Sequence, residues 1–175
     1  MFLYLMRHGI AVDRLDPRCP PDPERPLTDR GAARTRRAAA GLRASGVAPE
    51  VVLTSPYVRA RQTAEIAAEE LGVPAKRIVE VDALVPDGEP DELWAVLRQS
   101  GRESVLCVGH APQLDVFLAD ALCSREVVVT KLKKAGVACL ELTRGPHREG
   151  CRLASLLPPR ALRDLADGGA PRTDP

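Results

Sequence analysis

Aromatic residues are scarce in this sequence, since Phe, Trp and Tyr together make up 3% of its 175 residues. A hydrophobic share of 45% nevertheless excludes a disordered chain and suits one domain with a core of Leu, Val and Ala. No apolar stretch reaches the ~18 residues of a membrane span, so we expect no membrane partner. The N-terminus shows no basic region and no cleavage site ahead of its apolar run, so we expect no secretory signal.

The sequence also lacks an excess of charge of either sign. It has 25 basic and 24 acidic residues, a net charge of +1. We therefore expect no nucleic-acid partner, although local basic patches remain possible. Residues 34–43 are rich in arginine, but no aromatic residue is interleaved for base stacking. This favours a solvated basic helix face.

Paired metal-binding or redox cysteines are absent as well. The five cysteines are odd in number and form no C-x-x-C pair. At least three lie in apolar surroundings, where a thiol behaves as a small hydrophobe. Reduced cysteines in a cytoplasmic protein are favoured over disulfides or a metal site. There is no GxxxxGK[ST] loop and no cluster of Asp, Glu and His at metal-ligand spacing, so we expect no metal and no cofactor.

Apolar runs and helix signals alternate along most of the chain. Strands are predicted over residues 1–6, 50–54, 78–81, 104–108, 127–132, 137–142 and 151–157. Helices are predicted over residues 28–44, 56–71, 91–99 and 112–122, with a short one around Leu162. The alternation predicts an α/β fold: a three-layer α/β/α sandwich whose sheet is mainly parallel, with helices on both faces. The last strands have no helices between them and are placed at the edge of the sheet.

Helix-end signals are clear at two places. Thr28 is a good N-cap for the first helix, and Gly46 follows its end. Ser55 and Pro56 predict that the second helix begins with a serine cap and a proline in its first turn. A single domain is expected over residues 1–157, followed by a tail at 158–175 that is partly frayed.

Five prolines fall within residues 13–26, which predicts a surface loop without regular structure. The loop leaves directly from the Arg7-His8-Gly9 tripeptide. It can line the mouth of a pocket, or it can be a solvated spacer, and the sequence favours neither.

Two histidines stand just past the ends of apolar strands, His8 after the first and His110 after residues 104–108. An Arg-His pair alone could belong to a solvated turn. However, the ends of parallel strands meet at one edge of a sheet, so these histidines can lie together. Arg59 falls in the first turn of a helix that follows a strand, where an anion is favoured. With Arg7, the four side chains would surround a tetrahedral anion, and phosphate is the natural occupant.

The motifs resemble those of the histidine phosphatase superfamily, which has the phosphoglycerate-mutase-like fold. They are RHG at residues 7–9, RPLTDRG at 25–31, SPYVRARQT at 55–63 and GH at 109–110. The resemblance covers roughly residues 1–157, with the motifs in the expected order. The short length and the RPLT segment make the sequence most similar to small bacterial phosphohistidine phosphatases of the SixA type.

The resemblance implies a role for each matching residue. His8 would be the nucleophile that takes the phosphoryl group. Arg7, Arg59 and His110 would bind the phosphoryl oxygens, and Arg25 would reach the same pocket. No metal would be needed, because the protein supplies the positive charge.

A proton donor for the leaving group is not marked by a motif. Many superfamily members use a carboxylate from the middle of the chain, and the candidates here are Asp82, Asp87 and Glu89. The expected function is a metal-independent phosphatase that removes phosphate from phosphohistidine in a protein. The alternative is a phosphatase for a small phosphate ester, such as a sugar phosphate or a nucleotide-derived metabolite, with the same machinery. A non-catalytic phosphate-binding module is disfavoured, because the RHG and GH motifs are intact.

Overall fold

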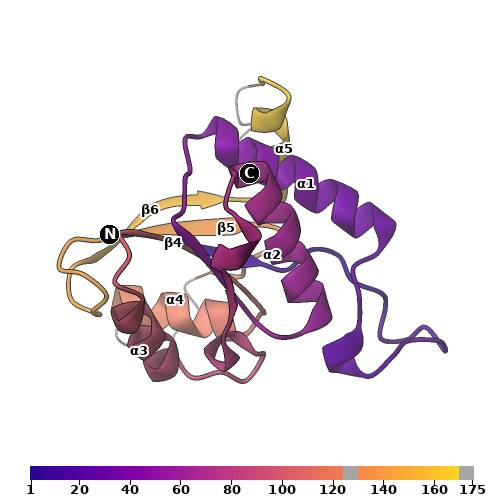
Figure 1. Cartoon of the computed structure of the whole chain (residues 1–175), viewed down its shortest axis with the longest axis horizontal. Helices are drawn as coiled ribbons and strands as arrows, with labels where there is room; N and C mark the ends of the chain where they lie inside the picture. Colours follow the sequence, from indigo (N-terminus) through magenta and orange to yellow (C-terminus); the bar gives the residue numbers. More distant parts are fainter. Residues whose placement is uncertain (124–129, 170–175) are drawn as a thin grey trace.

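The computed structural model describes residues 1–123 and 130–169 of the chain. These residues form a central sheet of six strands in the order β3-β2-β4-β1-β5-β6 (Figure 1). The strands are β1 (Phe2–Arg7), β2 (Val51–Thr54), β3 (Ile78–Glu80), β4 (Ser104–Gly109), β5 (Val137–Leu142) and β6 (Cys151–Leu157). The α-helices are α1 (Asp29–Ala44), α2 (Val58–Leu71), α3 (Pro90–Ser100), α4 (Gln113–Cys123) and α5 (Pro159–Ala166). Three short 3₁₀ turns complete the described elements: η1 (Asp22–Glu24), η2 (Ala75–Arg77) and η3 (Asp82–Leu84).

The centre of the sheet is parallel, as the sequence predicts. β4 pairs in parallel with β1 on one side and with β2 on the other, and β2 pairs in parallel with β3. β5 and β6 are antiparallel and form one edge, where no helix separates them. The C-terminal ends of β1, β2 and β4 therefore lie side by side at one end of the sheet, where ligands bind in open α/β folds.

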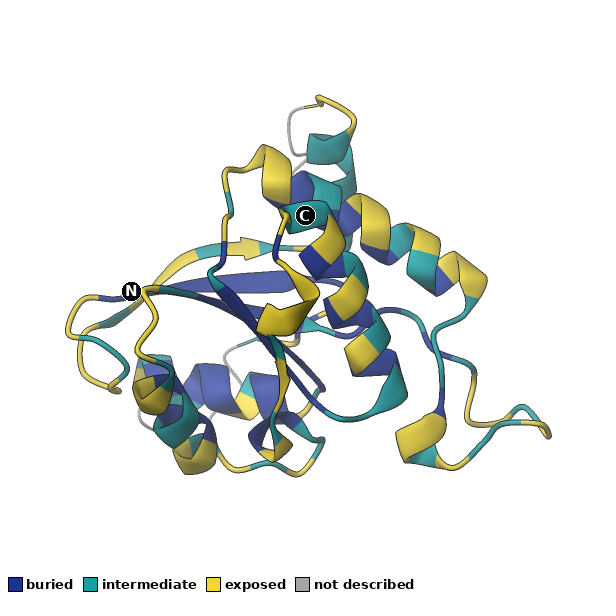
Figure 2. Ribbon diagram, viewed as in Figure 1, coloured by how far each residue is buried: buried dark blue, intermediate teal, exposed yellow. Residues whose placement is uncertain are grey.

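Alternate residues of β1 supply two separate hydrophobic cores, one on each face of the sheet. Leu3 and Leu5 pack with residues of α3 and α4, where Trp94 meets Phe117 with ring centroids 4.7 Å apart. Tyr4 belongs to the core that α1, α2 and α5 cover. The helices thus lie on both sides of a buried sheet (Figures 1 and 2), which confirms the three-layer prediction.

Helix α5 packs directly on α1, although the sequence analysis placed its residues in a tail. Leu162 of α5 is fully buried in the core that α1, α2 and α5 cover. The contact is so close that a Cβ atom on Gly41 would lie 1.8 Å from the Leu162 carbonyl oxygen. Glycine is therefore needed at position 41 for the two backbones to meet. The predicted short helix around Leu162 is confirmed.

Thr28 caps α1 as predicted, since its Oγ1 accepts a hydrogen bond from the Gly31 N–H at 3.0 Å. The predicted start of α2 at Pro56 is wrong: the helix begins at Val58, and Tyr57 occupies the cap position. Ser55 does not cap the helix, because its hydroxyl pairs with the ring of His110 and accepts from the Tyr57 N–H instead.

The prediction of an entirely irregular loop over residues 13–26 is also corrected, because η1 forms a turn of 3₁₀ helix within it. The strand predicted over residues 127–132 lies partly outside the described residues. Of its residues, 130–132 are described, and these are not in a strand. Among the described helices, none is long and apolar enough to cross a lipid bilayer.

Candidate active site

Two histidine rings meet at the C-terminal end of the sheet. In the parallel ladder Arg7 of β1 lies opposite Gly109 of β4, so the next residues, His8 and His110, leave adjacent strands together. The backbone N–H of His8 still donates to the Gly109 carbonyl at 2.9 Å. The ring centroids are 5.0 Å apart, and both side chains are buried. The sheet register therefore brings together the two histidines predicted for the site.

The hydrogen bonds of His8 determine which of its nitrogens carries the proton. Nδ1 lies 2.7 Å from the Gly9 carbonyl oxygen, which can only accept, so Nδ1 is the donor. Nε2 accepts from the Nε–H of Arg59 at 3.3 Å. Burial, with the nearby Arg59, Arg7 and Lys134 cations, lowers the pKa of His8 to about 3 against the opposing effect of the Gly9 bond. His8 is thus a neutral imidazole with its lone pair on Nε2, the form that can act as a nucleophile.

Arg59, in the first turn of α2, lies beside Nε2 of His8. Its side chain is 1% exposed. Its Nη1 donates to the Asp22 carbonyl oxygen at 2.5 Å, and its Nη2 donates to the Asp22 carboxylate at 3.0 Å. The guanidinium carbon also lies 5.0 Å from the centroid of the Tyr57 ring. The hydrogen bonds to Asp22 and the contact with the Tyr57 ring thus hold the guanidinium beside His8.

His110 is also neutral. Its Nε2 lies 2.9 Å from the Ser55 hydroxyl, and its ring meets that of Tyr57 edge-on at 5.1 Å. Burial lowers the pKa of His110 to about 2, and the neighbouring His8 and Arg59 act in the same direction. Neutral rings allow two histidines and two arginines to share a small volume.

Two buried nitrogens of the cluster have no hydrogen-bond partner among the described residues, Arg7 Nε and His110 Nδ1. Arg7 uses Nη1 to donate to the Leu132 carbonyl at 2.8 Å, and burial lowers the pKa of its guanidinium. Buried polar groups are ordinarily paired, so unpaired ones call for an explanation. The oxygens of a bound phosphoryl group would provide acceptors for this cluster.

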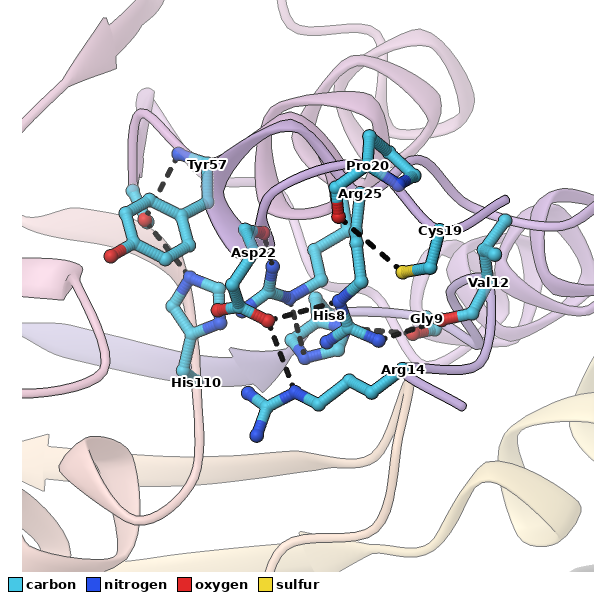
Figure 3. A network of polar contacts seen from close by, with 12 residues as sticks. His8, Gly9, Val12, Arg14, Cys19, Pro20, Asp22, Arg25, Tyr57 and His110 are labelled. Atoms are coloured by element: carbon cyan, nitrogen blue, oxygen red, sulfur yellow. Dashed lines mark hydrogen bonds and ion pairs between the residues drawn. The ribbon is translucent and has the colours of Figure 1, made fainter. Parts of the chain in front are cut away.

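Asp22 is a component of the site that the sequence analysis missed. Its carboxylate pairs with Arg59, with Arg25 Nε at 2.9 Å and with Arg14 Nε at 3.1 Å (Figure 3). Burial acts to raise the pKa of Asp22, but the three guanidiniums outweigh it, Arg59 most, and the pKa is lowered. Asp22 is therefore an ionised carboxylate on the arginine predicted to bind phosphate. The only signal in the sequence was an acidic residue in the loop that leaves the RHG tripeptide.

Arg25 is linked to Arg59 through Asp22. It is buried, and its Nη1 donates to the Val12 carbonyl at 2.6 Å. A cavity of about 490 Å³ opens beside it, lined by residues of the loop that include Arg14, Asp22 and Arg25. The loop over residues 13–26 thus lines the mouth of the site.

The three candidate proton donors do not join this network. The side chains of Asp82, Asp87 and Glu89 are all exposed. Within the described part of the chain, none of them makes a side-chain hydrogen bond or an ion pair. The segment that carries them nevertheless approaches the end of β4, since a Cβ atom on Gly109 would lie 3.2 Å from the Leu84 carbonyl oxygen.

Residues of α2 hold the loops around His8 in place. Thr63 accepts from the Gly9 N–H at 3.0 Å and donates to the Arg59 carbonyl at 2.7 Å. One residue before it, the Gln62 side chain accepts from the Leu27 N–H at 2.8 Å. Arg59, Gln62 and Thr63 of one helix therefore connect the RHG tripeptide, the RPLT segment and the phosphate-binding position.

The site can perform nucleophilic displacement at an anionic centre. It offers the neutral imidazole of His8 with a lone pair on Nε2, a second neutral imidazole, the buried Arg59 and Arg25, and the half-buried Arg7. No group of three or more His, Cys, Asp or Glu side chains that could hold a metal ion occurs among residues 1–123 and 130–169.

Comparison with known proteins agrees with this geometry. The sequence model of the histidine phosphatase superfamily (branch 1) matches residues 3–84. Over 129 residues the chain is 36% identical to the phosphohistidine phosphatase SixA of Escherichia coli K12, covering 72% of this chain and 76% of that protein. The chain belongs to the histidine phosphatase superfamily.

Solved structures of other phosphatases share the fold. The structure of the protein histidine phosphatase SixA in complex with tungstate superposes with a TM-score of 0.77 at 28% identity, covering 91% of this chain and 97% of that one. The α-ribazole phosphatase of Shigella flexneri has a TM-score of 0.72 at 16% identity, covering 91% and 97%. The phosphoglycerate-mutase-like fold predicted from the sequence is confirmed, and the chain is a phosphatase of this superfamily.

Proposed function

We propose that this histidine phosphatase removes the phosphoryl group from phosphohistidine in a protein, without a metal ion, in the cytoplasm. The observation that carries the proposal is the state of His8, a buried neutral imidazole whose lone pair lies on Nε2, where it accepts a hydrogen bond from Arg59. The likeness to SixA supports phosphohistidine as the substrate.

The reaction has two displacements. In the first, His8 Nε2 attacks phosphorus, the bond from phosphorus to the substrate imidazole breaks, and that imidazole leaves with the electron pair and takes up a proton. In the second, water attacks phosphorus, the bond to Nε2 breaks, and inorganic phosphate leaves. Arg7, Arg59 and His110 donate hydrogen bonds to the oxygens on which charge is spread, and Arg25 supports them through Asp22.

The location of the acidic side chains favours phosphohistidine over an ester. An alkoxide leaving from an ester is a strong base, and a positioned proton donor is worth ~10²–10⁴-fold for such a step. An imidazole is a far weaker base and leaves with less help. Asp82, Asp87 and Glu89 are exposed and hold no fixed position in the network. Asp22, bound by three arginines, has a lowered pKa and is a poor acid.

A small phosphate ester is the competing substrate, because the same nucleophile and arginines would serve it and the fold is shared with an α-ribazole phosphatase. The test compares kcat/KM on a phosphohistidine protein and on an aryl phosphate, with EDTA present throughout. We expect the wild type to turn over phosphohistidine faster than the aryl phosphate. The triple variant Asp82→Asn, Asp87→Asn, Glu89→Gln should keep most of its activity on phosphohistidine, because none of these carboxylates holds a fixed position in the network.

His8→Ala is the matched control for the chemistry and should abolish turnover of both substrates. Rapid quenching of the wild type without acid should trap a phosphoenzyme that is acid-labile and base-stable, with the label on His8. Loss of phosphohistidine turnover in the triple variant, without unfolding, would place the ester first. Activity that disappears in EDTA and returns with a divalent ion would refute the metal-free mechanism.

A further inference from the structure

A groove of about 400 Å³ beside the active site is lined by cationic side chains from four separate parts of the chain. We call it the basic groove. Its cations are Arg7, Arg34, Lys133, Lys134, Arg160 and Arg163. No Asp or Glu is among the described residues that line it. Since the whole chain has a net charge of only +1, this is a marked segregation of charge.

Most arginines elsewhere in the described ranges are paired with carboxylates. On the outer faces of α1 and α2, for example, Arg36 pairs with Glu69 at 2.8 Å, and Arg61 pairs with Glu80 at 3.5 Å. In contrast, Arg34, Lys133, Lys134 and Arg163 make no ion pair within the described ranges. Within the described ranges, the positive charges of these four groove residues are therefore not neutralised by ion pairs with the protein's own carboxylates.

The mutual repulsion of these cations is evident in two of them. Burial lowers the pKa of Lys134, and the charges of three nearby arginines, Arg7, Arg25 and Arg14, lower it further. The carboxylate of Asp13 acts in the opposite direction but does not outweigh them. Burial likewise lowers the pKa of Arg163, with Arg34 and two further arginines outweighing Asp164. A bound anion would relieve this repulsion.

The basic groove begins at the nucleophile. Arg7, the residue before His8, lines it. The Ala135 N–H donates to the carbonyl oxygens of Arg7 and His8 at 2.9 and 3.2 Å, which places the Lys133–Lys134 segment against the RHG tripeptide. Lys134 is close enough to act on the charge state of His8. From there the groove continues past Arg34 of α1 to Arg160 and Arg163 of α5.

We propose that the basic groove binds an acidic polypeptide segment of the protein substrate, next to the phosphohistidine in the chain of that substrate. This inference rests on the proposed function and adds the chemistry of its partner. A single phosphoryl group is already served by the cluster around His8, and a volume of about 400 Å³ exceeds what one such group fills. Cations spread over a loop and two helices suit a series of carboxylates along a polypeptide.

The test measures binding of two fluorescent peptides at low salt. Both carry the same unphosphorylated histidine core; one is flanked by glutamates and the other by glutamines. The groove variant is Lys133→Glu, Arg160→Glu. The matched control, Lys76→Glu, Arg98→Glu, changes the net charge equally at exposed sites on η2 and α3.

We expect the wild type and the control to bind the glutamate peptide more tightly than the glutamine peptide. The groove variant should lose about tenfold in affinity for the glutamate peptide, as expected for two surface ion pairs turned repulsive. Raising the salt concentration should weaken binding of that peptide. With the phosphorylated forms of both peptides as substrates, kcat/KM should show the same preference.

Equal affinity for the two peptides, or equal losses in the groove variant and the control, would overturn the inference. Tighter binding of a single-stranded oligonucleotide than of the glutamate peptide would assign the groove to nucleic acid instead. Failure of the proposed function can be distinguished from failure of this inference. In the former case neither phosphorylated peptide would be turned over, while the glutamate peptide would still bind.

Discussion

At the scale of single residues, two arginines in one motif have opposite environments. Arg59 and Arg61 are two positions apart on α2, so their side chains project about 200° apart around the helix. Arg59 is 1% exposed and contacts His8, whereas Arg61 is 47% exposed and pairs with Glu80 at 3.5 Å. The helix period therefore decides which of the two belongs to the active site.

Arg59→Ala should lower kcat/KM by ~10²–10³-fold, as for loss of a preorganised donor to a transition-state oxyanion. Arg61→Ala should change it by no more than about twofold, since it removes only an exposed ion pair. Steady-state kinetics on a phosphohistidine substrate measure both, with thermal unfolding to show that each variant is folded. Equal losses would mean that the wrong face of α2 has been assigned to the site.

Residue-level prediction from the sequence succeeded where a local signal sufficed. Thr28 has the chemistry of a cap and acts as one, and His8 and His110 follow apolar strands whose ends meet. Ser55 has the same local signal as Thr28, yet its hydroxyl is used by His110, far away in the sequence. Asp22 meets Arg59 only in the folded chain. Pairings of that kind leave no pattern in the sequence for periodicity or spacing to detect.

At the scale of elements, the loop over residues 13–26 brings a carboxylate onto Arg59, the arginine proposed to bind phosphate. The Asp22 side chain and its backbone carbonyl both accept from Arg59. Because the carbonyl contact does not depend on the side chain, Arg59 keeps one contact with the loop when the carboxylate is neutralised. The charge of Asp22 can thus be removed with little disturbance of the loop.

Asp22→Asn should therefore strengthen competitive inhibition by vanadate, an oxyanion that mimics phosphoryl transfer. Removing one partly screened negative charge should lower the inhibition constant by about fivefold. Asp16→Asn, in the same loop, is the control, because the only ion pair of Asp16 among the described residues is with Arg18. A weaker inhibition in Asp22→Asn would show that the carboxylate is needed to position Arg59.

The elements themselves were largely predictable, since strands and helices alternate with clear periodicity. The edge strands β5 and β6 were recognised as consecutive, although their antiparallel pairing comes from tertiary contacts. The packing of α5 on α1 was not predicted from the sequence. The residues that follow α5 are rich in Asp, Gly and Pro, and this composition is typical of a tail. The docking of α5 depends on Gly41 of α1, a contact that only the folded molecule shows.

At the scale of the whole molecule, two buried neutral histidines make stability depend on pH. The pKa of His8 is lowered to about 3 and that of His110 to about 2, both from the ordinary value of 6.5. Below pH 6.5 the unfolded chain binds protons that the folded chain does not, so stability falls as the pH decreases. The stabilising effect of the neutral rings is complete above pH 6.5.

The free energy of unfolding by urea, measured between pH 7 and pH 5, should decrease on acidification. The slope approaches about 1.4 kcal/mol per pH unit for each histidine. His110→Gln should reduce the slope by about half, while His147→Gln, at an exposed residue, should leave it unchanged. A slope unaffected by His110→Gln would show that this ring is not held neutral by the fold.

The position of β4 between β1 and β2 also governs how the protein can be made. Strand β1 is synthesised before both of its neighbours in the sheet, β4 and β5, so no residue between it and Ser104 pairs with it in the native sheet. At a synthesis rate of ~5–20 residues per second, the apolar first strand waits roughly five to twenty seconds on the ribosome for its partner. During that interval the nascent chain exposes a sheet-forming segment, the condition under which chains aggregate. His8 is thus translated well before His110, and the two rings can meet only after the second half of the chain has emerged.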